Sequence, residues 1–428
     1  MGMHGHPYSG ILAYLIVPAL FVFGLLLIPL GLRRARRRAA GAAEFPVLDF
    51  NQPQVRSRFL VFFVLTVLNV VIIAAATYKT VEVMDTTEFC GVTCHSVMEP
   101  EYTAFQRGPH ASTRCVDCHI GPGAGWFVKS KLSGSWQVVS VALDLYPTPI
   151  PTPVHNLRPA RETCEQCHWP QKFVGDRLKV LTRYDDDEAN TPLKTVLLMR
   201  VGGLAGRQSQ GIHWHVDPAN TIRYRSDESR EEIFEVELTS RDGRTDRWFA
   251  PGADEGEAAT AGVWRTMDCV DCHNRPSHTF RTPEREVDHA LETAHIAADL
   301  PFVRREGLRL VGVTYADKAA AEAGIRDGLA AFYAAEYPEL ARERAGDIAA
   351  AAQALHEGWS SNVFPGMKVG WNTYPNHIGH ESSPGCFRCH DDMHETADGR
   401  VISQDCESCH SLLAMEETEP GILATLSP

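Results

Sequence analysis

All twelve cysteines of this 428-residue chain fall in six pairs, and a histidine follows each pair directly. Five pairs have two residues between the cysteines, whereas the first pair has three. The order Cys-x-x-Cys-His is typical of covalent haem attachment, in which the thiols bond the haem and the histidine ligates its iron. The six sets are Cys90, Cys94 and His95; Cys115, Cys118 and His119; Cys164, Cys167 and His168; Cys269, Cys272 and His273; Cys386, Cys389 and His390; and Cys406, Cys409 and His410.

Zinc binding and disulfide bonding are the other common uses of paired cysteines. Zinc sites combine two pairs, or one pair and two separate histidines, at short fixed spacing. Here the gaps between pairs range from about twenty to about a hundred residues, and each pair has its own histidine. A disulfide framework is typical of small domains without a core, and it gives no role to the six histidines. The sequence therefore predicts six covalently bound c-type haems.

Two apolar stretches, residues 11–32 and 59–78, precede the first pair, and each is long enough to cross the hydrocarbon core of a bilayer. Seven arginines between Arg33 and Arg58 lie in the connection, which the positive-inside rule places in the cytoplasm. A cleaved signal peptide would instead carry its basic residues before the apolar run. We therefore expect two transmembrane helices in a bacterial cytoplasmic (inner) membrane, with the bulk of the chain in the periplasm.

Charge limits the partners further. Neither apolar stretch contains Asp, Glu, His, Lys or Arg, so neither offers a histidine ligand or a proton relay within the bilayer. The net charge of −13 is divided unevenly, because residues 1–80 hold eight Lys/Arg and two Asp/Glu and the remainder therefore carries −19. We expect no nucleic acid partner, since the acidic remainder suits docking to a basic redox protein instead.

The expected fold is a membrane anchor (residues 1–80) with two N-terminal transmembrane helices, followed by a periplasmic multihaem cytochrome c domain that is mostly α-helical or irregular. Residues 81–180 hold three haem motifs and an expected amphipathic helix at 129–145 near the membrane surface. Residues 181–260 are rich in β-branched and aromatic side chains and predict a small antiparallel β insertion. Residues 261–428 hold the other three motifs and an Ala-rich helical segment. The expected strands are 195–201, 212–216, 221–225, 232–239 and 245–249, with a hairpin turn at Asp242-Gly243.

Haems that only carry electrons normally have a second axial ligand, usually His or Met. The candidates lie close to the motifs in the sequence: Met98, His110, His155, His278, His377, His380 and His394. His213 and His215 alternate on an expected strand, so they point to opposite sides and at most one faces a given haem. The remaining five histidines, His4, His6, His289, His295 and His356, are expected to be structural.

The stretch at residues 59–145 resembles a known family. It combines an apolar helix with TTEFC, the first Cys-His, Met98, the tripeptides PEY and GPH, and the motif CVDCH. In order and spacing it resembles the NapC/NirT/NrfH-type membrane-anchored multihaem c-type cytochromes, which are quinol dehydrogenases. The stretches LRPARETCEQCHWP and TYPNHIGH resemble longer multihaem variants. The typical family member has one anchor and fewer haems, and its spacings at the first motif and the following methionine are shorter by one residue.

The resemblance implies oxidation of quinol, the expected substrate, from the membrane quinone pool at the periplasmic face. Electrons would pass to a periplasmic redox partner or to a membrane respiratory complex. The resemblance also implies that the haem at Cys90 and Cys94 lies nearest the quinol with Met98 as its ligand, and that His110 is the distal ligand of another haem. It further implies a proton acceptor near the first haem, for which the candidates are Glu99, Lys129, Lys131 and Asp144.

Two other functions remain open. A non-catalytic electron-transfer subunit would dock to a larger membrane complex through its helices, and the charge-free second stretch favours it. A terminal reductase would require at least one haem without a sixth ligand. Isolation within a complex would indicate the first alternative, and high-spin spectral signals would indicate the second.

Overall fold

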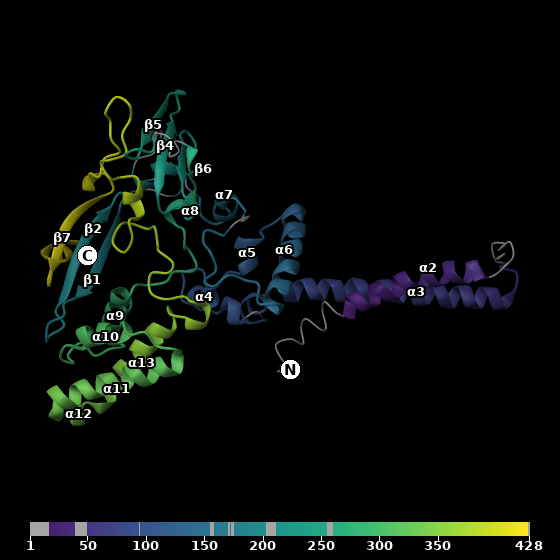
Figure 1. Cartoon of the computed structure of the whole chain (residues 1–428), viewed down its shortest axis with the longest axis horizontal. Coiled ribbons are helices and arrows are strands. Elements are labelled where there is room, and N and C mark those ends of the chain that lie inside the picture. Colours follow the sequence, from purple (N-terminus) through teal and green to yellow (C-terminus); the bar gives the residue numbers. More distant parts are fainter. Residues whose placement is uncertain are drawn as a thin grey trace. The chain divides into compact units, whose positions relative to one another are not determined.

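The computed structural model describes residues 17–38, 49–93, 95–154, 158–169, 172, 175–202, 211–254 and 260–426. They form two compact units, and each has its own set of elements (Figure 1). The first unit comprises the chain up to Met98 and Arg114–Val116, and the second comprises Glu99–Thr113 and the chain from Asp117 onward.

A long apolar helix, α3 (Pro53–Met84), dominates the first unit. It begins at a proline, which suits the first position of a helix because no N–H donor is needed there. None of its 32 residues is buried, and its length of about 48 Å exceeds a hydrocarbon core of about 30 Å. Within the described ranges, α3 is the one helix long and apolar enough to span a membrane.

The other helix of this unit is α2 (Val17–Arg38), which contains Pro29 and ends in the arginine cluster. The predicted stretch 11–32 begins outside the described residues, and α2 does not qualify as a membrane span. The first of the two predicted crossings therefore stays a prediction.

The first cysteine pair begins on a π-helical turn, η2 (Phe89–Thr93), directly after α3. A π turn closes its hydrogen bond one residue later than an α turn, so it accommodates one extra residue. The first motif has that extra residue between Cys90 and Cys94. Cys94 lies outside the described residues, and α4 (His95–Gln106) follows it.

Two antiparallel sheets form the β part of the second unit. One has four strands in the order β5-β4-β3-β6, and the other has three in the order β1-β2-β7. The C-terminal strand, yellow in Figure 1, thus pairs with a strand from the middle of the chain. The strands are β1 (Arg177–Tyr184), β2 (Pro192–Met199), β3 (Thr221–Ser226), β4 (Ile233–Thr239), β5 (Thr245–Phe249), β6 (Val263–Thr266) and β7 (His410–Glu417).

The predicted antiparallel strands and the turn at Asp242-Gly243 are confirmed, with one exception. The predicted strand at 212–216 is wrong, because this segment forms the 3-10 helix η4 (Ile212–Val216). Gly211, which precedes it, has φ 76° and ψ −164°, a conformation that is essentially restricted to glycine. The Ile212 N–H donates to the Arg200 carbonyl at 2.9 Å, so the turn is held against the end of β2 rather than paired in a sheet.

A helical bundle supplies the largest core of the second unit. Its central side chains, among them Leu300, Ile325 and Trp359, are at most 1% exposed. The β1–β2 hairpin is tied to it by buried Asn190, which donates to the Leu300 carbonyl at 2.8 Å and accepts from the Arg304 N–H at 2.9 Å. The helices are α9 (Pro283–Glu292), α10 (Val303–Val311), α11 (Lys318–Glu336), α12 (Pro338–Glu343) and α13 (Ala345–Ser360).

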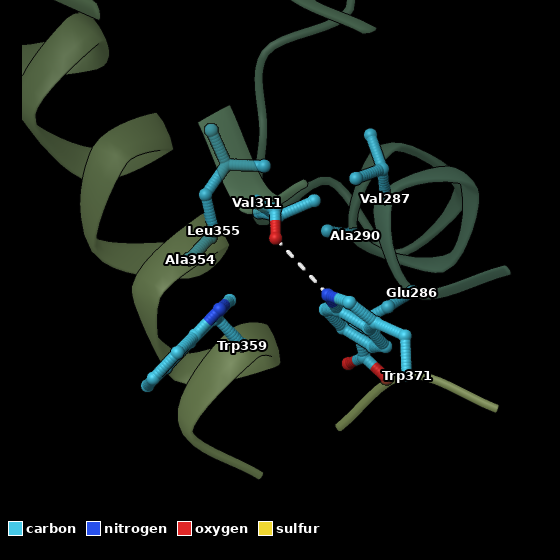
Figure 2. A pocket seen from close by; sticks show the side chains of 8 residues that line it. All are labelled: Glu286, Val287, Ala290, Val311, Ala354, Leu355, Trp359 and Trp371. Carbon is cyan, nitrogen blue, oxygen red and sulfur yellow. Dashed lines mark hydrogen bonds between the residues drawn. The ribbon is translucent and has the colours of Figure 1, made fainter. Parts of the chain in front are cut away.

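A small hollow in this bundle lies between α9, α10 and α13 (Figure 2). The Trp371 indole closes one side by donating to the Val311 carbonyl at 3.0 Å. Its lining contains no cysteine or histidine, so the hollow is part of the scaffold rather than a haem site.

The remaining elements are short and lie mostly around the motifs. The helix α6 covers most of the predicted amphipathic segment 129–145 but begins five residues earlier. These elements are α5 (Cys115–His119), α6 (Ala124–Ala142), α7 (Ala160–Cys164), α8 (Cys269–Cys272), η6 (Pro365–Met367), η7 (Gly385–Arg388), η8 (Cys406–Ser408) and α14 (Gly421–Leu426).

Candidate haem sites

The Cys-x-x-Cys-His motifs lie on short helical turns. In three motifs the histidine N–H donates to the carbonyl of the first cysteine, at 2.7 Å for His168, 2.8 Å for His273 and 3.1 Å for His390. Residues three and four apart lie on one face of such a turn, so both thiols and the imidazole serve the same side. None of the described cysteines is in a disulfide, so no pair among them is joined as the disulfide alternative requires.

Five motif histidines each lie opposite a second histidine that comes from elsewhere in the chain. The ring centroids are 5.7 to 6.4 Å apart. Metal–imidazole bonds of about 2 Å on both sides of one iron would place the two centroids roughly 6 Å apart. The pairs are His119–His278 at 6.1 Å, His168–His110 at 5.9 Å, His273–His213 at 6.4 Å, His390–His215 at 5.7 Å and His410–His380 at 6.2 Å.

In five of these ten rings a backbone carbonyl accepts a hydrogen bond from Nδ1–H and orients the ring. Such a bond fixes the tautomer with the lone pair on Nε2, which is the usual arrangement of a metal-bound histidine. The Nδ1 acceptors are the carbonyls of Glu101 for His278 (2.9 Å), Pro276 for His110 (3.2 Å), Val201 for His213 (3.1 Å), Ile212 for His215 (2.8 Å) and Ser403 for His390 (2.8 Å).

The surroundings also favour the neutral imidazole, which is the form that binds a metal. Burial lowers the pKa of His119, His215 and His273, and the neighbouring histidine of each lowers it further. Burial likewise lowers the pKa of His213 and His410. These rings are therefore uncharged at neutral pH and available as ligands.

Buried guanidinium groups supply a second test of the fit. Arg230 Nε, Arg265 Nε and Arg275 Nη2 are buried without a hydrogen-bond partner in the described part of the chain. Arg230 and Arg275 already pair with Asp271 and Glu101 through another nitrogen, so these three atoms are additional donors, and an anionic acceptor would satisfy them. The two carboxylate groups that a haem carries fit this need, and the residues present therefore fit the cofactor that the motifs imply.

Thiols of different motifs lie next to one another. A hydrogen bond joins the thiols of Cys164 and Cys269, and it lowers the pKa of the first and raises that of the second. In the first unit, a hydrogen bond from Cys90 lowers the pKa of Cys115 to about 6. Cys272 is buried, which raises its pKa to about 11, and its nearest charged neighbours include Cys386. Neighbouring motifs are therefore in contact, as a row of electron carriers requires.

Three of the predicted second ligands belong to these pairs, namely His110, His278 and His380. Two others have different partners: His377 Nε2 lies 2.8 Å from the Glu231 carboxylate, and His394 engages Asp391 through Nδ1 and the Ile233 carbonyl through Nε2, both at 3.0 Å. Because both its ring nitrogens are occupied, His394 has no lone pair to offer an iron. His155 lies outside the described residues.

Met98 lies on α4, three residues after His95, whose side chain is outside the described residues, so their arrangement stays a prediction. The expectation for His213 and His215 was that at most one of them faces a given haem. Their spacing of two residues was read as strand alternation, and only the 3-10 turn shows that both rings face a motif.

The proton-acceptor candidates lie in different surroundings. The Glu99 carboxylate forms an ion pair with the Lys318 ammonium group, with 2.7 Å between Oε1 and Nζ. The ammonium groups of Lys129 and Lys131 lie over the rings of Trp126 and Phe127, at 4.7 and 4.9 Å. Asp144 follows α6 with φ 52°.

One face of α6 carries a row of exposed apolar side chains at helical spacing. Their exposed fractions range from 43% to 70%, and no charged residue interrupts the row, which comprises Val128, Leu132, Trp136, Val139 and Leu143. Such an exposed apolar face on an otherwise packed protein marks an interaction site.

Known proteins provide an independent comparison. Residues 52–150 match the family model described as the NapC/NirT cytochrome c family, N-terminal region. The chain is 42% identical over 418 residues to the cytochrome c-type protein ImcH of Geobacter sulfurreducens, an alignment that covers 96% of this chain and 82% of that protein. No solved structure matches the chain.

Proposed function

Since this chain belongs to the NapC/NirT cytochrome c family and is a membrane-anchored multihaem cytochrome of electron transport, we propose that it oxidises quinol and passes the electrons along six haems. The oxidation takes place at the periplasmic face of the cytoplasmic membrane. The acceptor is a periplasmic redox protein or a membrane respiratory complex.

The observation that carries this proposal is the set of five paired histidines. A c-type haem held by two imidazoles carries one electron at a time and has no open position for a substrate. The five pairs therefore supply carriers, and the side chain of His95, in the first motif, lies outside the described residues. This arrangement argues against a terminal reductase, which needs an open site, and favours transport along neighbouring motifs.

The membrane side of the proposal rests on α3 and α6. α3 carries no buried residue, and its apolar side chains are free to contact lipid. The apolar row on α6, with Lys129 and Lys131 beside it and Trp136 within it, has the composition of a helix that lies in a membrane interface. We propose that α6 lies at the periplasmic membrane surface, and that α2 forms the first of the two crossings predicted from the sequence.

Quinol oxidation releases two electrons and two protons, so a base must stand beside the first carrier. We propose this role for one of Glu99, Lys129, Lys131 and Asp144. Glu99 is adjacent to Met98 in the sequence, and its carboxylate forms an ion pair with Lys318 at 2.7 Å.

The experiment that tests the proposal is reduction of the purified protein in detergent by a quinol analogue, followed in the haem absorption bands. We expect quinol to reduce the protein, with dithionite giving the full extent of reduction as the reference. Full haem content with no reduction by quinol would refute quinol oxidation while leaving electron transport intact.

A second candidate is the non-catalytic electron-transfer subunit. The charge-free part of α3, residues 59–78, favours it, because the same apolar surface that contacts lipid can pack against another membrane subunit. Isolation under mild detergent distinguishes the two: a lone protein that quinol reduces supports the first proposal, and stable recovery only with other membrane subunits supports the second.

A further inference from the structure

One short turn carries two of the paired histidines. His213 and His215 lie on η4 and face different motifs: the His213 ring is nearly parallel to that of His273 (5°), and the His215 ring is inclined by 75° to that of His390. A 3-10 helix has three residues per turn, so side chains two residues apart point in different directions. A single turn can thus supply a ligand to each of two irons.

The backbone fixes this turn without help from a cofactor. The Ile212 and His213 N–H groups donate to the carbonyls of Arg200 and Val201 at 2.9 and 3.2 Å. A side chain at Gly211 would clash with the Arg200 carbonyl, so the strand end and the turn are in close contact. Trp214 packs against the core of the four-stranded sheet and meets the His215 ring edge-on at 5.7 Å.

The two motifs are neighbours by a separate observation. Cys272 of one motif lies close enough to Cys386 of the other for the charges of the two thiols to interact, and Cys389 is likewise near Cys272. The motifs therefore approach each other on the cysteine side as well as through the ligands on η4.

We infer that His213 and His215 ligate the haem irons of the motifs that end at His273 and His390, respectively, so that η4 joins these two haems into one rigid pair. The inference rests on the haem content of the proposed function but not on quinol as the electron donor. Because both ligands share one turn of backbone, a displacement of η4 moves both irons' ligands together.

The test replaces each histidine by methionine, a ligand that raises the reduction potential of a haem relative to histidine. Low-temperature electron paramagnetic resonance and near-infrared magnetic circular dichroism count the haems that keep two histidines. We expect His213→Met and His215→Met each to convert one haem, and the double variant to convert two. The control is His295→Met, because the His295 side chain is exposed and the hydrogen bond of its ring is with the nearby Thr293 hydroxyl.

The second measurement uses His213→Gly and His215→Gly with added imidazole, which remains informative if the methionine variants accumulate poorly. We expect a high-spin signal from one haem in each variant and its loss when imidazole is added. A double methionine variant that converts one haem or none would overturn the inference, and so would glycine variants that stay fully low-spin. Reduction by quinol is scored separately on the unaltered protein, so two converted haems in the double variant together with no reduction of the unaltered protein by quinol would refute the proposed donor alone.

Discussion

A buried ion pair stands behind one of the paired histidines, and breaking it should change both stability and potential. Arg275 donates to both oxygens of Glu101 at 3.0 and 3.2 Å, with 7% and 15% of the two side chains exposed. The other face of the carboxylate lies 3.2 Å from His278 Nδ1. Arg275 also lies over the Tyr374 ring at 3.9 Å. Removal of Arg275 therefore leaves a buried negative charge beside the imidazole of His278, a proposed second ligand.

We expect Arg275→Met to lower the apparent free energy of unfolding by about 3–5 kcal/mol, the usual cost of an uncompensated buried charge. An iron held between His119 and His278 would be separated from the Glu101 carboxylate by the His278 imidazole and one metal–nitrogen bond, or about 7 Å. At that distance, the interaction energy of a unit charge with the iron is about 2 kcal/mol at an effective dielectric constant of about 20. Negative charge stabilises the oxidised iron, so the potential of this haem should fall by on the order of 100 mV.

Potentiometric titration and guanidinium unfolding of the full chain in detergent measure the two effects. Arg275→Met combined with Glu101→Gln removes the stranded charge and should return most of the lost potential. Arg281→Met breaks a more exposed pair with Glu286, and should cost less than about 1 kcal/mol and leave the potentials unchanged. A stability loss with every haem potential unaltered in Arg275→Met would refute the position of Glu101 behind a ligand.

Three further outcomes are expected. Glu99→Gln should slow reduction by quinol about tenfold or more while dithionite reduction is unchanged, if Glu99 accepts the proton; equal rates in stopped-flow would remove it as the acceptor. Gly211→Ala should displace η4 and convert two haems together to high spin, as counted by paramagnetic resonance; conversion of a single haem would contradict the shared turn. Leu132→Asp on the α6 row should lower quinol-dependent reduction several-fold, with exposed, off-row Gln137→Glu as the control, because a charge there disfavours contact with lipid; an equal effect of both changes would argue against membrane contact.

Local patterns in the sequence were sufficient to predict the elements that depend on contacts between residues close in the chain. The motif cysteines and histidines lie on single turns of chain, and β5 has the predicted bounds because its alternation and the Asp242-Gly243 turn are contiguous. Second ligands are a different matter, since they reach the motifs through tertiary contacts. His394 lies four residues from His390, yet its ring hydrogen-bonds to Asp391 and to the Ile233 carbonyl. The histidine that faces His390 is His215, which is distant from it in the sequence.

The strand at the C-terminus shows the same limit. β7 directly follows the cysteines of a haem motif, and no strand was predicted there. Its partner β2 lies some two hundred residues earlier in the chain, so a local pattern does not reveal the pairing. The 3-10 turn at 212–216 was mistaken for a strand because alternation of apolar and polar residues does not distinguish them over five residues. The decisive feature was Gly211, whose positive φ ends the extended chain.

The paired histidines also have a consequence for how the chain reaches its folded state. Each pair joins residues that are distant in the sequence, so ligation on both sides of an iron closes a long loop, as a disulfide does. Closing a loop of about 15 to 100 residues removes roughly 3–5 kcal/mol of chain entropy from the unfolded state. With the proposed ligation, five such cross-links would restrain the segments around the motifs, which are short turns with few buried side chains of their own. The haems would then cross-link and stabilise the fold of the second unit, and haem attachment would have to precede its final folding.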